Sequence, residues 1–280
     1  MRYGKNQLIS PVLKWAGGKR QLLDTLIPLL PKDYSVYCEP FVGGGALFFA
    51  LQPQLACIND INHELIQVYT VIKNNVDALI ERLKTFQNDK EHFYEVRSWD
   101  RNKDSYAQLS DIEKAARIIY LNRTCFNGLF RVNASGEFNV PFGSYANPNI
   151  VNEPVLRAIN GYLNSAEIAI STGDYAEILR NLPDNAFVYL DPPYDPVSAT
   201  ASFTSYTKGG FSREEQIRLR RYCDELNERG IKFMLSNSAT DFICEQYGKY
   251  NIKIVSARRL VGANLSSRGK MQEIIVRNYE

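Results

Sequence analysis

The chain has 280 residues, 45% of them hydrophobic, and its 33 basic and 31 acidic side chains leave a net charge of +2. This length suits one large domain or two modest ones, and the composition excludes a disordered or collagen-like protein. No apolar run approaches the roughly 20 residues that a membrane span needs, and the N-terminus lacks the apolar stretch of a signal peptide, so we expect a cytoplasmic protein.

The first elements alternate between strand and helix. Residues 36–41 are typical of a strand that runs into three glycines, residues 46–51 of a short helix, and residues 55–58 of a second strand. This alternation is the start of a β-α-β unit in an α/β fold.

A helical segment and a hairpin follow. Between residues 62 and 126, apolar residues recur every three or four positions, which predicts helices. Ser110 and Glu113 have the spacing of a capping box, which predicts the start of one of them. Two short alternating runs within residues 130–140 flank residues 134–136, which predicts a β-hairpin with a three-residue turn.

The α/β pattern then resumes. Five more strands are predicted, the last two as an antiparallel pair, at residues 167–171, 186–190, 231–235, 252–255 and 273–277. A helix is predicted from a capping box at Ser212 to a stop at Gly230. The simplest architecture is one α/β domain, residues 1–60 and 166–280, interrupted by a mostly helical insertion at residues 61–165.

No metal site is predicted. His63 and His92 lie in predicted helices and are expected to be solvated, which disfavours a histidine triad or a multi-histidine metal site. The cysteines are scattered and form no Cys-x-x-Cys pair, which argues against a disulfide framework or a thiolate zinc site. They are Cys38, Cys57, Cys125, Cys223 and Cys244.

A glycine-rich turn follows the first predicted strand. Gly43, Gly44 and Gly45 allow the backbone to approach a ligand closely, and Asp60 at the end of the second strand suits a ribose diol. Phe48 stands where the dinucleotide fingerprint requires a glycine, so an adenosine-type ligand without a pyrophosphate is favoured. A tight strand–helix turn without a ligand is the alternative.

The segment Lys14 to Lys19 resembles a phosphate-binding loop only superficially. Leu13 stands where that loop needs its first glycine, and Arg20 stands where a serine or threonine would hold magnesium. Trp15 beside two glycines can pack over a flat ligand, and a core tryptophan is the alternative.

Asp191-Pro192-Pro193-Tyr194 is the strongest signal of chemistry. It directly follows a predicted buried strand, where α/β folds place their active sites. The Asp191 carboxylate and the Pro192 carbonyl can each accept a hydrogen bond from one amino group, and Tyr194 offers a planar face for stacking. This set is suited to polarising an exocyclic amine, and a proline-rich strand terminator is the alternative.

Six segments closely resemble the Dam-type DNA adenine-N6 methyltransferases, in the same order and over nearly the whole chain. They are KWAGGK (14–19), EPFVGGGALF (39–48), ND (59–60), NGLFRVNASGEFNVPFGSY (127–145), DPPYDPVSATASF (191–203) and RGK (268–270). The DPPY element is shared with other amino methyltransferases, whereas the 127–145 block is far more specific. The resemblance implies a Rossmann-like methyltransferase sheet with helices on both faces, and a helical target-recognition domain with a β-hairpin at residues 61–165.

The same resemblance implies S-adenosylmethionine as cofactor and double-stranded DNA as partner, with no metal and no membrane, in a nucleoid-associated protein that is monomeric in solution. The implied cofactor-binding residues are Trp15, Lys19, Glu39, Gly43, Gly45, Asp60, Asp174, Tyr175 and Asp191.

The mechanism implied by the resemblance is methylation of an adenine that has left the duplex, because N6 is inaccessible inside the base stack. Tyr194 is expected to stack on this base. Asp191 and the Pro192 carbonyl are expected to accept hydrogen bonds from its two N6 hydrogens. This positioning frees the nitrogen lone pair to attack the methyl group.

In this family the hairpin reads the DNA sequence, and the resemblance implies 5′-GATC. Arg131 can donate two hydrogen bonds to a guanine edge in the major groove. Phe126 stands at an aromatic position suited to filling the gap left by the flipped base. The other residues that match recognition positions are Asn127, Leu129, Pro141 and Tyr145. Ser144 and Ala146 stand where relatives often have basic residues. We expect this difference to affect contacts with DNA phosphates more than the choice of target sequence.

The low net charge hides an uneven distribution. Residues 1–20 carry five basic and no acidic side chains, residues 249–280 carry seven basic and two acidic, and residues 149–196 carry two basic and seven acidic. We expect the basic ends to face the DNA phosphates, and the acidic run to lie where a sulfonium cofactor and an amine bind. The arginines of the insertion that we expect to face phosphates are Arg117, Arg123 and Arg131.

Three alternatives stay open. The first is methylation of a protein or RNA amide or amine, although such enzymes usually carry Asn at the position of Asp191. The second is a DNA-binding protein that has lost catalysis, and the third is a nicotinamide dehydrogenase, which Phe48 disfavours. A restriction–modification role and a role in replication or repair require the same chemistry.

Overall fold

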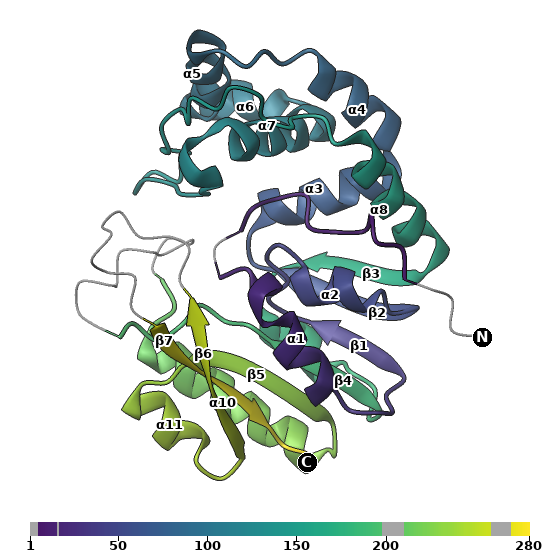
Figure 1. Ribbon diagram of the computed structural model, residues 1–280, viewed down its shortest axis with the longest axis vertical. Helices are drawn as coiled ribbons and strands as arrows, with labels where there is room; N and C mark the ends of the chain where they lie inside the picture. The colour runs from purple at the N-terminus through teal and green to yellow at the C-terminus, as the bar shows by residue number, and fades with distance from the viewer. Residues whose placement is uncertain (1–4, 16, 198–209, 259–269) are drawn as a thin grey trace. The chain divides into compact units, whose positions relative to one another are not determined.

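The computed structural model describes residues 5–15, 17–197, 210–258 and 270–280 (Figure 1). The end of the DPPY segment and most of the RGK motif lie outside the described residues. The chain divides into two compact units. The first contains residues 1–18, 43–54 and 62–172, and the second contains residues 19–42, 55–61 and 173–280. The helical unit thus includes the N-terminus and the glycine-rich turn, in addition to the predicted insertion.

The second unit is built on strands in the order β2-β1-β4-β5-β7-β6. The bounds of these strands are β1 Val36–Glu39, β2 Leu55–Asp60, β4 Ala186–Leu190, β5 Lys232–Ser238, β6 Asn251–Arg258 and β7 Lys270–Arg277. The first four are parallel, with Cys38 paired to both Cys57 and Val188, and β7 runs antiparallel to β5 and to β6. The predicted parallel start and the antiparallel closing pair are confirmed.

Helices cover both faces of this sheet, as predicted. Alternate residues of β4 point to opposite faces, and the whole strand is buried, as is typical of a central parallel strand. Val188 and Leu190 pack in one core with α9 (Tyr175–Arg180), α10 (Arg213–Glu228) and α11 (Asp241–Tyr247). On the opposite face, the Phe187 ring lies against Tyr34 and Tyr279, and the Tyr279 hydroxyl donates to the Leu29 carbonyl at 3.1 Å. Leu29 ends η2 Ile27–Leu29, which follows η1 Lys19–Leu22 and α1 Leu23–Leu26, and Figure 1 shows α1 over this sheet.

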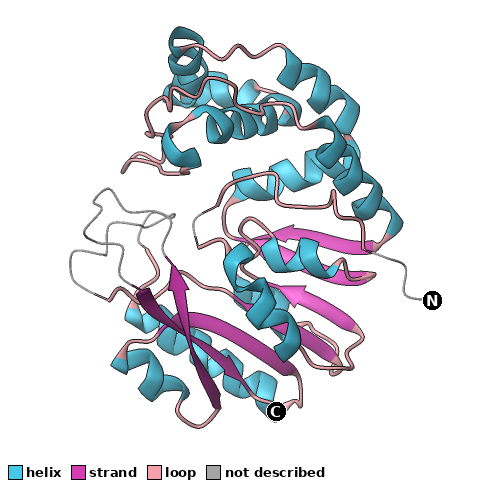
Figure 2. Cartoon of the chain, in the orientation of Figure 1, coloured by secondary structure: helices cyan, strands magenta, loops and turns pink. Residues whose placement is uncertain are grey.

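The first unit is mostly helical (Figure 2). Its elements are α2 Ala46–Leu51, α3 His63–Asn74, α4 Val76–Lys84, α5 Lys90–Ser98, η3 Trp99–Arg101, α6 Lys103–Gln108, α7 Asp111–Thr124, η4 Phe126–Gly128, α8 Glu153–Ser165 and β3 Glu167–Thr172. Helix α7 packs against α3, α4 and α5 and is buried along most of its length. The predicted capping box at its start is confirmed, because Ser110 accepts from the Glu113 N–H and the Glu113 carboxylate accepts from the Ser110 N–H.

The predicted hairpin is also present, but its ladder is short. The Asn133 N–H donates to the Glu137 carbonyl at 2.9 Å, and this pair closes a three-residue turn. The Asn139 N–H donates to the Arg131 carbonyl at 3.0 Å. Between residues 127 and 150, all of which are described, the backbone forms only isolated bridges and no continuous strand. An isolated two-stranded hairpin is marginally stable in water, so its position depends on what it packs against.

Candidate functional site

Asp191 lies at the carboxyl end of β4, directly after its last residue. The sheet order reverses between β1 and β4, and open α/β sheets bind ligands outside such a switch point. Lys19, at the start of η1, is 5% exposed, and its Nζ lies 2.7 Å from Asp191 Oδ1. The structure therefore brings together two predicted site residues that are 172 positions apart in the sequence.

Burial and charge act on the Asp191 carboxyl in opposite directions. Burial raises its pKa to about 6, while the Lys19 ammonium group opposes this increase. At neutral pH Asp191 is therefore mainly a carboxylate, which accepts hydrogen bonds and donates none.

Tyr194 completes this cluster. Lys19 Nζ lies 4.8 Å from the centre of the Tyr194 ring, within the range of a cation–π contact. The Tyr194 hydroxyl donates to Glu273 Oε2 at 2.9 Å. Burial, together with the charges of Asp191 and Glu273, raises the pKa of Tyr194 well above its usual value, so the phenol stays neutral. The hydrogen bond to Glu273 holds its ring in place.

The backbone that follows Asp191 is anchored by polar side chains that the sequence did not single out. Gln216 Nε2 donates to the Pro193 carbonyl at 2.8 Å, and Gln216 Oε1 accepts from Asn237 Nδ2 at 3.0 Å. The Asp195 N–H donates to Asn237 Oδ1 at 3.1 Å. Glu273, Gln216 and Asn237 could not be predicted from the sequence, because they come from β7, α10 and β5 and no local pattern links them to the DPPY segment.

Two more predicted acids lie at the ends of neighbouring parallel strands. Glu39 ends β1, is 2% exposed and accepts from the Tyr37 hydroxyl at 2.7 Å. Asp60 ends β2 and is half-buried, and its carbonyl accepts from the Gly173 N–H at 3.2 Å. Parallel strands end at the same edge of a sheet, so these acids and Asp191 share that edge.

Asp174 and Tyr175 have structural partners within the second unit. Asp174 caps α9, and Arg218 donates to both of its carboxylate oxygens, at 2.8 and 2.9 Å. These hydrogen bonds lower the pKa of Asp174 below its usual value. The Tyr175 ring is buried and packs against Phe41 with 5.0 Å between ring centres. Their predicted contact with the cofactor stays a prediction.

The glycine-rich turn and Trp15 belong to the first unit. Gly43 and Gly45 have φ of +48° and +68°, in the left-handed region that favours glycine. A Cβ on Gly43 would lie 3.1 Å from Trp15 Cδ1. The half-buried Trp15 ring stacks on Phe130 at 4.7 Å, so the tryptophan packs against the turn itself.

Most of the predicted recognition residues are accessible. Phe126, Asn127, Arg131 and Pro141 are exposed, with Phe126 at 51%, whereas Leu129 and Tyr145 are half-buried. The Arg131 guanidinium is oriented across the hairpin, since its Nε donates to the side chain of Asn139 at 2.7 Å and its Nη2 donates to the Asn139 carbonyl at 3.3 Å.

Lys14 lies among these residues and was missed, although it begins the KWAGGK motif. Asn122 holds its backbone, accepting from the Lys14 N–H at 2.8 Å and donating to the Lys14 carbonyl at 2.9 Å. The exposed Lys14 ammonium group lies 5.5 Å from the centre of the Tyr145 ring. A positive charge therefore accompanies the predicted recognition residues.

Comparison with known families matches residues 15–261 to the family described as D12 class N6 adenine-specific DNA methyltransferase. The chain belongs to this family. It is 48% identical over 278 residues to the Type II methyltransferase M1.LlaDCHI of Lactococcus lactis subsp. cremoris, covering 98% of each chain. It is 41% identical over 292 residues to the Type II methyltransferase M.MjaIII of Methanocaldococcus jannaschii, covering 97% of this chain and 99% of the relative. It is 34% identical to the DNA adenine methylase of Escherichia coli strain K12, covering 94% and 93%.

For this D12 methyltransferase, the expected phosphate contact of Arg117 is wrong. Its side chain is fully buried, and its guanidinium lies 2.6 Å from Asp100. Arg123 also points inward in part, because it donates to the Val12 carbonyl. Of the three arginines, Arg131 is the exposed one.

The expectation of two solvated histidines is half right. His63 is exposed, whereas the ring of His92 is partly covered by Phe86 and Tyr120. In the part of the chain that the structure describes, no three His, Cys, Asp or Glu side chains are grouped so as to hold a metal ion. Within the same residues, every helix is too short or too polar to cross a membrane.

Proposed function

We propose that this adenine-N6 DNA methyltransferase uses S-adenosylmethionine to methylate an adenine that is flipped out of double-stranded DNA, within 5′-GATC-3′. The observation that carries the proposal is the half-buried Asp191 carboxylate at the end of β4, with the Tyr194 ring and the Lys19 ammonium group beside it. A hydrogen-bond acceptor for its amino group and a flat surface for stacking are the two features that an extruded adenine requires.

We propose that Asp191 accepts a hydrogen bond from one N6 hydrogen and that the Pro192 carbonyl accepts a hydrogen bond from the other. Lys19 is ion-paired with Oδ1, so Oδ2 is the oxygen proposed for the amino group. Holding both hydrogens orients the nitrogen lone pair and stabilises the positive charge that develops on the amine.

The acidic strand ends fit a cationic, ribose-containing cofactor. Glu39 and Asp60 end β1 and β2, and Asp191 follows the adjacent strand β4. Asp60 is accessible enough to accept hydrogen bonds from a ribose diol. When bound, S-adenosylmethionine supplies an activated methyl group. The contributions of Trp15, Gly43, Gly45, Asp174 and Tyr175 to its site are proposed from the family resemblance.

Base flipping is supported by two aromatic side chains. The ring of Tyr194 is fixed through its hydroxyl, so it can stack on the extruded adenine without first losing side-chain freedom. Phe126 is 51% exposed, and exposing so large an apolar side chain to water is unfavourable. This exposure suits a side chain that fills the gap left in the base stack.

Reading of the target is assigned to Arg131, with Asn127, Leu129, Pro141 and Tyr145 as supporting contacts. The exposed guanidinium of Arg131 has the planar donor geometry that recognises a guanine edge. The names of the relatives that are 48% and 41% identical favour a role in restriction–modification.

The test is transfer of labelled methyl groups to a GATC-containing duplex, with Asp191→Ala as control. We expect label on adenine N6 for the natural protein and none above background for the variant. Calorimetry with S-adenosylmethionine tests the cofactor independently of turnover. On a random-sequence library, methylation confined to adenines outside GATC would contradict the proposed target but not the chemistry.

A further inference from the structure

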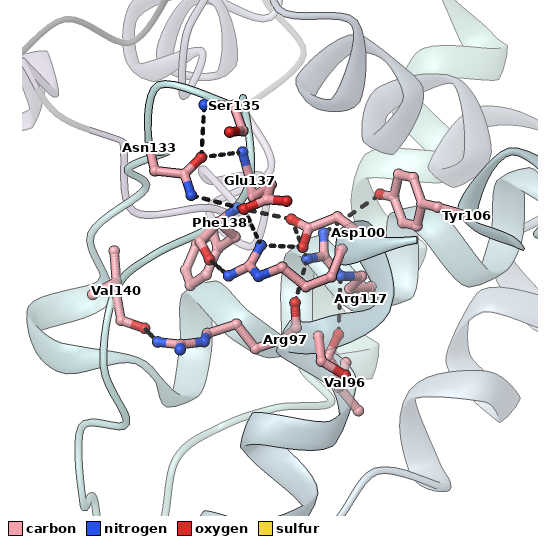
Figure 3. Close-up of polar contacts among 12 residues, drawn as sticks. Val96, Arg97, Asp100, Tyr106, Arg117, Asn133, Ser135, Glu137, Phe138 and Val140 are labelled. Carbon is pink, nitrogen blue, oxygen red and sulfur yellow. Dashed lines mark hydrogen bonds and ion pairs between the residues drawn. The ribbon is translucent and has the colours of Figure 1, made fainter. Parts of the chain in front are cut away.

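A cluster of charged side chains, two of them buried, lies against the backbone of the hairpin in the first unit (Figure 3). It consists of Asp100 and Arg101 from η3 and Arg117 from α7. Arg117 is 0% exposed and Asp100 is 4% exposed. Buried charges are costly unless they are paired and fully hydrogen-bonded, so the bonds of this cluster indicate what it does.

Arg117 is the fixed centre of the cluster. Its Nη2 lies 2.6 Å from Asp100 Oδ2, and it also donates to the carbonyls of Val96 and Arg97, each at 3.0 Å. Its Nη1 lies 3.4 Å from the Tyr106 hydroxyl. Because α5, η3 and α7 all contribute, the position of Asp100 is set by three elements.

Asp100 and Arg101 hold both backbone polar groups of one hairpin residue. Asp100 Oδ2 accepts from the Phe138 N–H at 2.7 Å, and Arg101 Nη2 donates to the Phe138 carbonyl at 2.6 Å. Arg101 is also bonded to Asp100. Phe138 itself is 2% exposed, and its ring packs edge-on against Phe130. These charge-assisted bonds replace the regular strand pairing that the short hairpin lacks.

The residue after Phe138 is Asn139, which bonds to Arg131 in three ways. The Asn139 N–H donates to the Arg131 carbonyl, and both the side chain and the carbonyl of Asn139 accept from the Arg131 guanidinium. A continuous chain of bonds therefore joins Arg117 and Asp100 to the guanidinium of Arg131, through the backbone of Phe138 and Asn139.

We propose that Asp100, Arg101 and Arg117 are positioning residues for target recognition, which fix the hairpin backbone at Phe138 so that Arg131 meets the DNA base edge in one orientation. This inference rests on the base-reading role proposed above for Arg131. Productive base contacts require placement within about 0.5 Å, which a hairpin with so few ladder bonds does not secure alone.

Arg101→Ala is the variant of choice. It removes the donor to the Phe138 carbonyl but leaves Arg117 paired with Asp100, whereas Asp100→Asn would leave a buried guanidinium without its nearest counter-charge. Arg101 is 32% exposed in its side chain, so its loss leaves little cavity. The matched control is Arg157→Ala on α8, because Arg157 forms its ion pairs with Asp77 and Glu153 and not with residues of the hairpin.

The measurement is discrimination, defined as the ratio of kcat/KM on the target duplex to kcat/KM on duplexes changed at one base pair. We expect Arg131→Ala to lower it by about 5- to 150-fold at one position. Arg101→Ala should lower it at that same position by about three- to tenfold, with Arg101→Lys recovering part of the loss and Arg157→Ala unchanged. The double variant should lose less than the product of the two single effects.

The outcomes separate the two proposals. Unchanged discrimination in Arg101→Ala, or effects of Arg101→Ala and Arg131→Ala that multiply fully, would overturn the positioning role while leaving Arg131 as a reader. Lost discrimination in Arg101→Ala with none lost in Arg131→Ala would overturn the reading role of Arg131, and with it the proposal that the cluster acts by orienting Arg131. Hydrogen exchange provides a second readout, since faster exchange of the Phe138 amide in Arg101→Ala, with unchanged overall stability, is expected only if the cluster holds the hairpin.

Discussion

Asp191 combines burial with a neighbouring positive charge, and these two features act on its pKa in opposite directions. The balance leaves the carboxyl with a pKa of about 6, well above the usual 3.8. A carboxyl with a raised pKa is protonated on mild acidification, and a protonated oxygen no longer accepts a hydrogen bond from an amino group. The proposed role of Asp191 therefore has a direct consequence for activity.

We predict that kcat/KM falls as the pH is lowered through about 6, by up to about tenfold for each further pH unit. Activity falls on acidification because the ionised form of Asp191 is the proposed hydrogen-bond acceptor. The measurement is the pH–rate profile between pH 5 and 8, with circular dichroism as a control for unfolding. A profile that is flat down to pH 5 would show that Asp191 is not the acceptor.

Tyr194 allows its ring and its hydroxyl to be tested separately. Tyr194→Ala removes the stacking surface and should lower the rate of methyl transfer by more than it weakens cofactor binding. Tyr194→Phe keeps the ring and loses the bond to Glu273, and we expect it to lower stability by about 1 kcal/mol while retaining most activity.

Single-turnover rates and calorimetry with S-adenosylmethionine distinguish these effects. Tyr250→Phe is the matched control for a lost hydroxyl, since Tyr250 donates to Asp224 at 2.6 Å within the same unit. An unchanged transfer rate in Tyr194→Ala would remove this residue from the site.

At the scale of elements, the turn before α2 shows why glycine is required. Gly45 is the N-cap residue of α2 and has φ of +68°, and a Cβ there would lie 3.0 Å from the Phe49 ring. Gly161 lies inside α8, and a Cβ there would meet no atom within 4 Å. The same substitution should therefore have opposite effects at the two positions.

We predict that Gly45→Ala lowers the free energy of unfolding by about 1–2 kcal/mol, because alanine is strained in the left-handed region. Gly161→Ala should raise it by about 0.5–1 kcal/mol, because alanine loses less conformational freedom on entering a helix. Urea denaturation measures both. Equal effects of the two substitutions would contradict the backbone argument.

At the scale of the whole molecule, the small net charge conceals basic and acidic segments, for which we propose different functions. The N-terminal basic run brings Lys14 to Tyr145, one of the proposed recognition residues, while acids lie at the ends of parallel strands in the second unit. Arg117 and Lys19, however, are neutralised internally by Asp100 and Asp191, so part of the positive charge is not available to DNA.

We therefore predict modest affinity for DNA that lacks the target sequence, with a dissociation constant of about 10⁻⁴ to 10⁻⁶ M at physiological salt. The logarithm of the binding constant should fall only gently with the logarithm of the salt concentration, since few phosphates are neutralised. Fluorescence anisotropy across a salt series measures this, and the same duplex with one GATC serves as the specific reference. A slope as steep as that for ten phosphate contacts would contradict the charge argument.

The local sequence was sufficient to predict most elements and the position of the candidate site. Strand β4 and helix α2 have the predicted bounds, and the Ser110 capping box and the three-residue hairpin turn are present. These features depend on neighbours within a few residues, through side-chain periodicity, capping bonds and turn geometry. For the same reason, the carboxyl end of β4 could be chosen as the place for chemistry.

Only the tertiary structure decided which charged side chains are paired within the protein and which are exposed to solvent. The pairing of Lys19 with Asp191, the bond from Tyr194 to Glu273, and the burial of Arg117 all join residues distant in the chain. Arg117 was misjudged because α7 is buried nearly all round, where an arginine is retained only if carbonyls and a carboxylate satisfy it. Whether such partners exist is a property of packing, and no local pattern contains it.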